Sequence, residues 1–597
     1  MKPITRYWKP ILSLLFGVAI MVFWAVPYVS GLCYQEQFQM FLFDGNYFVE
    51  RVILPGGLAD YVSEFLVQFD YVPVLGAAIV ALLLMAIQGT VWGLMRQFGA
   101  KHDFPGYLLS FVPSIVIWCY MGDPNVLLSF VVALLGALFI AWIHNHFHNR
   151  LVKVVFELVS TALVYWCLGP VVFVYAALLM GDVLMRGRQK GNLGAAIGYA
   201  AGILLLTIAW ILLTTQTLQY PLYRIFVGLN YYRYPGFVPS MQFVVMAMSV
   251  IVPLLGMIHF HPPVWLKLRQ SKMVIGVSYF LFIVASFFAV KGSFDEMTYE
   301  LIDYDFLVRT EQWDKIIEKA EKKQPTTPLG VSCVNLALSQ QDMLADHLFE
   351  FYQNGGEGLF PTFTRDMTSP LSTAEIFFRL GMVNDAERYM FEAQEAIPNY
   401  RKSSRMTRRI AECEIINGNY KVAAKLLRRL EKTLFYRHWA SDAMALLGHE
   451  RAINSHPVYG KLRKYRQKKQ DFLFSDREMD QMLGLLFLND KTNKMAYEYL
   501  MCYELLQRNM DKFMQYYPLG RFVGYDHIPR AFQEILIGNW MKTHHDPRSM
   551  PYSVDAQNVN NTLSFIQLYM SNPKDPQLDA QPYVTNAWHY MMQGENK

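Results

Sequence analysis

The hydrophobic pattern divides the chain into two regions. Residues 1–291 consist mostly of long apolar runs with few charges, whereas residues 292–597 show the periodicity of helices that are half exposed to water. In lipid, apolar runs of this length form helices, because the backbone must satisfy its own hydrogen bonds. We therefore expect an all-α protein, with a polytopic helical membrane domain followed by a soluble helical domain. The nine predicted spans are 10–29, 73–95, 106–121, 124–143, 152–168, 170–185, 193–213, 238–259 and 273–290.

Basic residues gather in alternate loops between these spans. The loops on one side carry pairs or triplets of lysine and arginine, whereas the longer loops on the other side carry isolated arginines. The positive-inside rule places the basic loops in the cytoplasm. The N-terminus is then cytoplasmic, and nine spans place the second half in the periplasm of a bacterial inner-membrane protein. The basic loop residues are Lys2, Arg6, Lys9, Arg96, Lys101, Arg150, Lys153, Arg186, Arg188, Lys190, Lys267, Arg269 and Lys272.

The first outer loop, residues 30–72, alternates aromatic and acidic positions. The break at Pro55-Gly56-Gly57 predicts a turn. The segments on either side show helical periodicity, so we expect two amphipathic helices that lie at the membrane surface. Their apolar faces are formed by Phe38, Phe41 and Leu42, and by Tyr61, Phe65 and Phe69.

Charged residues of both outer loops form a candidate site. The first loop contributes carboxylates, and the second long outer loop, residues 214–237, contributes two arginines among several tyrosines. If the second loop folds over the first, these carboxylates and guanidinium groups face one another at the outer surface. The residues concerned are Glu36, Asp44, Asp60 and Glu64, with Arg224 and Arg233.

The order of spans and the motif Phe43-Asp44-Gly45-Asn46-Tyr47-Phe48 resemble the membrane glycosyltransferases of the GT-C superfamily. That resemblance implies that Asp44, or else Glu36, is a general base for an acceptor hydroxyl. It also implies that Arg224 and Arg233 hold the phosphate of a polyprenyl-phosphate sugar, and it leaves a divalent metal open. The alternative interpretation is that the carboxylates are solvated faces of interfacial helices.

The second half contains a repeated helix-pair pattern. Segments 374–389 and 411–423 align with each other, and Gly381 and Gly418 occupy equivalent positions 37 residues apart. This pattern resembles the tetratricopeptide repeat, whose period is 34 residues. Small residues at such positions let paired helices approach closely, and stacked pairs form concave surfaces that bind peptides or proteins. We therefore predict a soluble tetratricopeptide-like α-solenoid over residues 292–597.

Composition narrows the function classes further. The net charge of +5 on 597 residues does not suggest nucleic-acid binding, and the six cysteines form no C-x-x-C pair. His144 and His148 share a helical face, but no acidic or cysteine neighbour in the sequence completes a metal site. Two acids within predicted spans, Glu157 and Asp182, lie near the cytoplasmic end, where we expect them to pair with neighbours such as Lys153 or Arg186.

The chain as a whole resembles an uncharacterised family of Bacteroidota multi-pass membrane proteins, known only as a domain of unknown function. This resemblance implies location and architecture without an activity. Two hypotheses follow from the sequence. The first is an envelope-assembly scaffold that sits in the lipid bilayer and recruits a protein or peptide partner through its repeats. The second is a GT-C-like glycosyltransferase that acts on a polyprenyl-phosphate lipid at the outer face.

Overall fold

The protein folds into two compact units. The computed structural model describes residues 7–100, 104–234, 237–257, 272–466, 475, 477–544 and 546–592. The first unit comprises Met1–Tyr299 together with two short later segments, Pro398–Ser403 and Lys432–Arg437, and the rest of the chain forms the second unit. In the described part all regular structure is helical, apart from one isolated antiparallel bridge between Val126 and Tyr232. The predicted all-α class is therefore confirmed.

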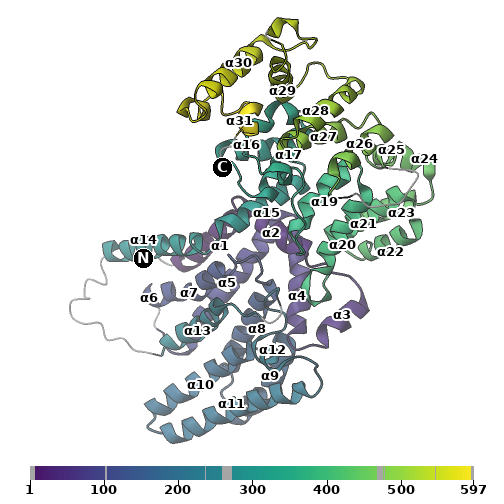
Figure 1. Cartoon of the computed structure of the whole chain (residues 1–597). Helices are drawn as coiled ribbons and strands as arrows, with labels where there is room; N and C mark the ends of the chain where they lie inside the picture. The colour runs from purple at the N-terminus through teal and green to yellow at the C-terminus, as the bar shows by residue number, and fades with distance from the viewer. Residues whose placement is uncertain are drawn as a thin grey trace. The chain divides into compact units, whose positions relative to one another are not determined.

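Each of the nine predicted spans contains helix (Figure 1), but 106–121 is interrupted at residues 110–111, and residues 26–28, 121, 124–127, 170–171, 238–239 and 256–257 of the predicted spans are not helical. Four of these helices have the length and apolarity to cross a membrane, and a fifth span is reached if Gly276–Lys291 and Glu296–Arg309 are taken together. The remaining helices are shorter or carry more charge, so the count of nine and the orientation stay predictions. The helices are α1 (Trp8–Ala25), α5 (Pro73–Gln97), α6 (Phe104–Leu109), α7 (Val112–Tyr120), α8 (Leu128–His144), α9 (Arg150–Leu168), α10 (Val172–Gln189), α11 (Leu193–Thr215), α13 (Ser240–Leu255) and α14 (Lys272–Lys291).

Several of the basic residues on which the orientation depends cannot be placed. Lys2, Arg6, Lys101, Lys267 and Arg269 lie outside the described residues, as do the last two residues of the predicted span 238–259.

Helix α5 lies at the centre of the first unit, between α1 and α8. Its buried face includes Leu84, Ile87, Val91 and Leu94, which recur every three or four residues. Because lipid tails are as apolar as leucine, close packing and internal hydrogen bonds, rather than escape from water, hold such helices together. Gln88 on this helix supplies two of those bonds: it accepts from Ser13 Oγ at 2.7 Å and donates to Ser110 Oγ at 2.8 Å.

The first outer loop differs from its prediction in one segment. It contains α2 (Val29–Gln37), α3 (Gly45–Val52), α4 (Gly57–Val67) and a short 3-10 helix, Gln68–Tyr71. The predicted turn at Pro55-Gly56-Gly57 is present, and Gly56 adopts a φ of +83°, which favours glycine.

Residues 38–43 are not helical, so the predicted helical face of Phe38, Phe41 and Leu42 is wrong. The physical reason is non-local hydrogen bonding. The backbone N–H of Met40 donates to the carbonyl of Lys402 at 3.0 Å, and that of Phe43 donates to the carbonyl of Lys432 at 2.8 Å.

The second unit contains the helix pairs that the repeat pattern predicts. Helices α19 (Ser369–Leu380) and α20 (Val383–Glu395) form one pair, and α21 (Ser404–Asn417) and α22 (Tyr420–Leu430) form the next. Gly381 and Gly418 follow the first helix of each pair with φ values of +92° and +83°, so both glycines are required by the backbone. The assignment to the tetratricopeptide family stays a prediction.

The remaining helices of the chain follow the same all-helical plan. They are α12 (Leu222–Val227), α15 (Glu296–Arg309), α16 (Trp313–Lys322), α17 (Pro328–Gln340), α18 (Leu344–His347), α23 (Arg437–Leu446), α24 (Glu450–Ser455), α25 (Tyr459–Tyr465), α26 (Met479–Asn489), α27 (Lys494–Leu506), α28 (Met510–Tyr516), α29 (Arg530–Met541), α30 (Ala556–Ser571) and α31 (Ala587–Met592).

Candidate functional site

Two buried carboxylates, Asp60 and Glu64, lie one turn apart on α4 and face two arginines. Arg401 places Nη2 at 2.6 Å from Asp60 Oδ1 and Nη1 at 2.9 Å from Glu64 Oε1. Arg51, from α3, places Nε at 2.9 Å from Glu64 Oε2. Two negative and two positive charges are thus matched inside the first unit. We call these four residues the α4 charge cluster.

Tyr47 completes this cluster from the first turn of α3. Its hydroxyl donates to Glu64 Oε2 and accepts from Arg51 Nη2, whose guanidinium lies 4.7 Å from the tyrosine ring centroid. Burial and the negative charge of Glu64 raise the pKa of Tyr47, so the phenol stays protonated. Burial also raises the pKa of Asp60, against the opposing effect of Arg401.

A line of amides connects the α4 charge cluster to Arg233. Arg401 Nη1 donates to Gln39 Oε1 at 3.2 Å, and Gln39 Nε2 donates to Gln35 Oε1 at 3.3 Å. Arg233 Nη2 donates to the same Gln35 oxygen at 2.8 Å. The second outer loop therefore meets the first, as the charge pattern suggested, although Arg233 bonds to an amide.

The Arg233 guanidinium is itself buried, and it lies 4.9 Å from the Phe38 ring centroid. Its Nε and Nη1 atoms have no hydrogen-bond partner among the described residues. Burial lowers the pKa of Arg233, and the positive charge of Arg401 adds to that effect.

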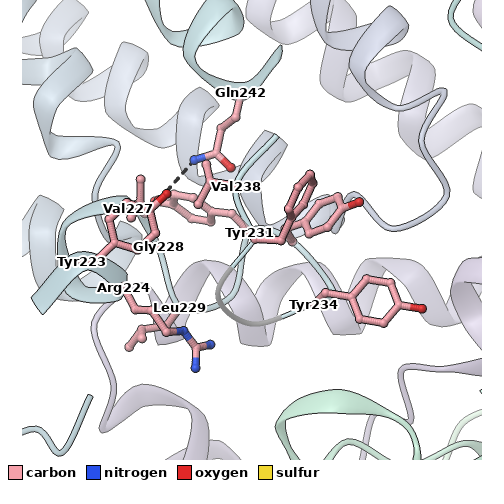
Figure 2. Close-up of a pocket in the computed structure, with 11 residues that line it drawn as sticks. Tyr223, Arg224, Val227, Gly228, Leu229, Tyr231, Tyr234, Val238 and Gln242 are labelled. Atoms are coloured by element: carbon pink, nitrogen blue, oxygen red, sulfur yellow. Dashed lines mark hydrogen bonds between the residues drawn. The ribbon is translucent and has the colours of Figure 1, made fainter. Parts of the chain in front are cut away.

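Arg224 occupies a different place, in a small pocket of the second outer loop (Figure 2). The pocket is also lined by Tyr223 and Tyr234, and Gln242 Nε2 donates to the Val227 carbonyl at 3.1 Å. Its free volume of about 10 Å³ is room for roughly one water molecule. A sugar phosphate would need the loop to open.

The predicted general base, Asp44, acts in the structure as a helix cap. Its Oδ1 accepts from the Asn46 N–H at 2.8 Å at the start of α3, and its Oδ2 pairs with Lys432 Nζ. The Lys432 ammonium, together with the Asn46 N–H, lowers the pKa of Asp44. A lower pKa makes a carboxylate a weaker base at neutral pH.

The second predicted acid, Glu36, is buried near another carboxylate. It accepts a hydrogen bond from Tyr436 Oη at 3.2 Å. Burial and the charge of Glu36 together raise the pKa of Asp70 well above its ordinary value. Tyr71 stacks on Phe435 beside this pair, with ring centroids 5.1 Å apart.

The partners of these carboxylates come largely from two later segments of the chain, which the charge pattern of the outer loops does not predict. Arg401 belongs to Pro398–Ser403, whereas Lys432 and Tyr436 belong to Lys432–Arg437. One signal was present in the sequence: the turn after α22 carries Leu434, Phe435 and Tyr436, although turns favour small and polar residues.

At the opposite end of the predicted spans, two acids are paired as well. Asp182 pairs with Arg186 at 2.6 Å, as expected. Glu157 pairs with His144 at 2.8 Å rather than with Lys153, and it also accepts from Tyr199. Within the described residues no group of three or more histidine, cysteine or acidic side chains converges as metal ligands would.

The apolar cavity of the first unit is separate from these charges. It has a volume of about 680 Å³ and lies between α4, α5 and α8. Neither Asp44, Glu36, Arg224 nor Arg233 lines it.

The candidate carboxylates of the first outer loop are thus ion-paired or hydrogen-bonded rather than free. Asp60 and Glu64 are each matched by an arginine, and Asp44 caps a helix.

Comparisons with known proteins identify a family and no activity. A family model described as a family of unknown function (DUF6057) matches residues 5–594, nearly the whole chain. No curated protein matches the chain, and no solved structure does.

Proposed function

We propose that this chain, which belongs to the DUF6057 family of unknown function, is an integral inner-membrane scaffold of the bacterial cell envelope. Its first unit anchors it in the bilayer. Its second unit, a periplasmic tetratricopeptide-like domain, recruits a protein or peptide partner.

The observation that carries this proposal is the state of the first outer loop. Its buried carboxylates Asp60 and Glu64 are ion-paired with Arg401 and Arg51, and Asp44 is paired with Lys432. A catalytic acid has to reach its substrate. Buried charges that only hold the fold together need partners of opposite charge. The ion pairs of Asp60, Glu64 and Asp44 therefore support a structural role for this loop, as a scaffold requires.

The second unit offers exposed apolar side chains on its helix pairs. Phe391 on α20 is 40% exposed and Val422 on α22 is 41% exposed. Aromatic residues are enriched at protein interfaces, so Phe391 is the stronger candidate anchor for a protein partner. Stacked helix pairs also form the extended surfaces on which peptides bind.

The predicted topology can be tested by cysteine accessibility. The described native cysteines are buried or half-buried, so an introduced exposed thiol is readily distinguished. We expect Lys421→Cys, in α22, to react with a membrane-impermeant maleimide once the outer membrane is permeabilised. We expect Arg188→Cys, in α10, to react only after the inner membrane is disrupted. The reverse pattern would contradict a periplasmic second unit.

Partner recruitment can be tested by site-specific photocrosslinking in cells. A photoreactive amino acid at Phe391 or Val422 is expected to give the same discrete crosslinked product. The same amino acid at the exposed Arg521 serves as the control and is expected to give none. If neither position gives a crosslinked product while the protein is present at its normal level, recruitment through these helix pairs is contradicted.

The transferase alternative has one observation in its favour. Ala59 lines the apolar cavity, and the next residue, Asp60, is a carboxyl whose pKa burial raises into a better range for proton transfer.

We expect Asp44→Asn and Asp60→Asn each to leave the surface-glycan profile of cells unchanged, because neither carboxylate reaches a substrate in a scaffold. Glycan electrophoresis with matched protein levels measures this, and Glu50→Gln, at an exposed position on α3, is the matched control. A glycan product lost in Asp44→Asn or Asp60→Asn but kept in Glu50→Gln would favour the transferase.

A further inference from the structure

The 680 Å³ cavity of the first unit is lined by apolar side chains and glycines, with one exception. The exception is Thr90, whose hydroxyl already donates to the Ala86 carbonyl of its own helix at 2.8 Å. The lining therefore offers an occupant no free side-chain hydroxyl or charge. The volume lies within the range of ordinary small-ligand pockets, roughly 300–1,000 Å³.

The shape of the cavity follows from the glycines of α5 and α8. Gly89 of α5 has no atom within 4 Å of the position that a Cβ would take, so this part of the wall is open space. Along α8 the lining runs from Val132 to Trp142. Ten residues of helix rise roughly 15 Å, about half the thickness of a bilayer's hydrocarbon core.

One wall of the cavity is formed by a helix that qualifies as a candidate membrane span. Helix α5 has 25 residues and a mean hydropathy of 2.3 in its most apolar window. Phe139 and Val62, both in the lining, are 48% and 36% exposed. With α5 crossing the bilayer, as its length and apolarity indicate, this exposed apolar mouth would face hydrocarbon.

The geometry points to one acyl chain of a bilayer phospholipid as the occupant of this cavity. The lining has little with which to select a headgroup, because it offers no charge, its one hydroxyl is already bonded within α5, and the Trp142 indole nitrogen lies against Gly93. A cavity that selects only for hydrocarbon is filled by the most abundant chains around it, and in a membrane these are phospholipid chains.

A second helix is a poorer occupant, although Gly89 and Gly93 have the spacing of a helix-packing motif. A Cβ on Gly93 would lie 2.8 Å from Trp142 Nε1, so that glycine already accommodates a side chain of the same unit. Only Gly89 remains open, and close backbone approach of a second helix needs both.

Native mass spectrometry of the full-length protein released from detergent tests the inference. The wild type is expected to retain one phospholipid per chain. Gly89→Phe fills the open space without a neighbour to displace, and it is expected to reduce the lipid-bound fraction at least fivefold. The matched control is Gly202→Phe, since Gly202 of α11 also has nothing within 4 Å; this variant is expected to bind lipid as the wild type does.

A second variant, Ala86→Phe, fills the cavity from another position on α5 and covers the case in which Gly89→Phe fails to fold. Equal phospholipid-bound fractions in the wild type and in whichever filling variant folds would overturn the inference. An adduct with the mass of an isoprenoid lipid, or a dimer lost in the filling variants, would also overturn it, because each assigns the cavity to another occupant. These outcomes do not depend on the scaffold role of the second unit.

Discussion

Replacing Arg401 with methionine is expected to lower the free energy of unfolding of the first unit by about 3–5 kcal/mol. The variant leaves Asp60 and Glu64 buried with Arg51 as their only strong cationic partner in the α4 charge cluster. A buried carboxylate that loses its partner retains the full cost of leaving water. Denaturant unfolding of the full chain in detergent micelles, followed by tryptophan fluorescence, measures the loss.

Two further variants separate the charge effect from simple loss of a side chain. Arg437→Met removes an arginine from an exposed position of the other late segment and is expected to be nearly neutral. Arg401→Met combined with Asp60→Asn restores charge balance, because Glu64 keeps Arg51, and it is expected to recover most of the stability. An Arg401→Met protein as stable as the wild type would show that Arg401 does not stabilise the α4 charge cluster.

The helices of the first unit could be predicted from the sequence because each is determined by the apolar residues of its own segment. A long apolar run such as 73–95 has one regular structure available in lipid, and it is α5 in the structure. The same holds for the paired helices on either side of Gly381, where a glycine with positive φ ends the first helix.

The segment 38–43 could not be predicted in the same way. Its apolar positions follow a helical period, yet Met40 and Phe43 donate their backbone N–H groups to Lys402 and Lys432. Hydrogen bonds to residues several hundred positions away replaced the local ones, and no periodicity within the loop contains that information.

The candidate site was predictable in its acidic half only. The sequence singled out Glu36, Asp44, Asp60 and Glu64 because they cluster in one loop. The same pattern predicts their basic partners in the nearest long outer loop, at Arg224 and Arg233. The strongest partner, Arg401, follows the last helix of a repeat pair. Which arginine pairs with a given carboxylate depends on the tertiary fold. The sequence alone therefore does not identify Arg401 as the partner of Asp60 and Glu64.

Replacing Arg409 with methionine is expected to destabilise the second unit by about 3 kcal/mol at neutral pH, near the lower end of the cost of breaking a buried ion pair. Arg409 Nη2 lies 2.7 Å from Glu375 Oε2, and its Nη1 pairs with Glu412. The guanidinium carbon also lies 3.8 Å from the Phe378 ring centroid. Glu412 keeps a second arginine, Arg408, at 3.3 Å, so the loss falls mainly on Glu375.

The pH dependence of this variant identifies the cause. Burial alone would raise the pKa of Glu375, but the charge of Arg409, with those of Arg405 and Arg379, outweighs burial and lowers it. In the wild type, Glu375 therefore contributes stability above about pH 4.5, and that contribution is lost as the pH falls through its folded pKa.

Without Arg409, Arg405 and Arg379 are left to oppose burial, so the folded pKa of Glu375 moves upward and the stability that Glu375 contributes above about pH 4.5 shrinks or is lost. The difference in unfolding free energy between wild type and Arg409→Met should thus be smallest at acidic pH and largest at neutral pH. When Glu375→Gln is present in both proteins, the difference caused by Arg409→Met should no longer depend on pH in this way, because the amide does not titrate. A difference that stays constant from pH 4 to pH 8 would mean that Arg409 acts through packing on Phe378 alone.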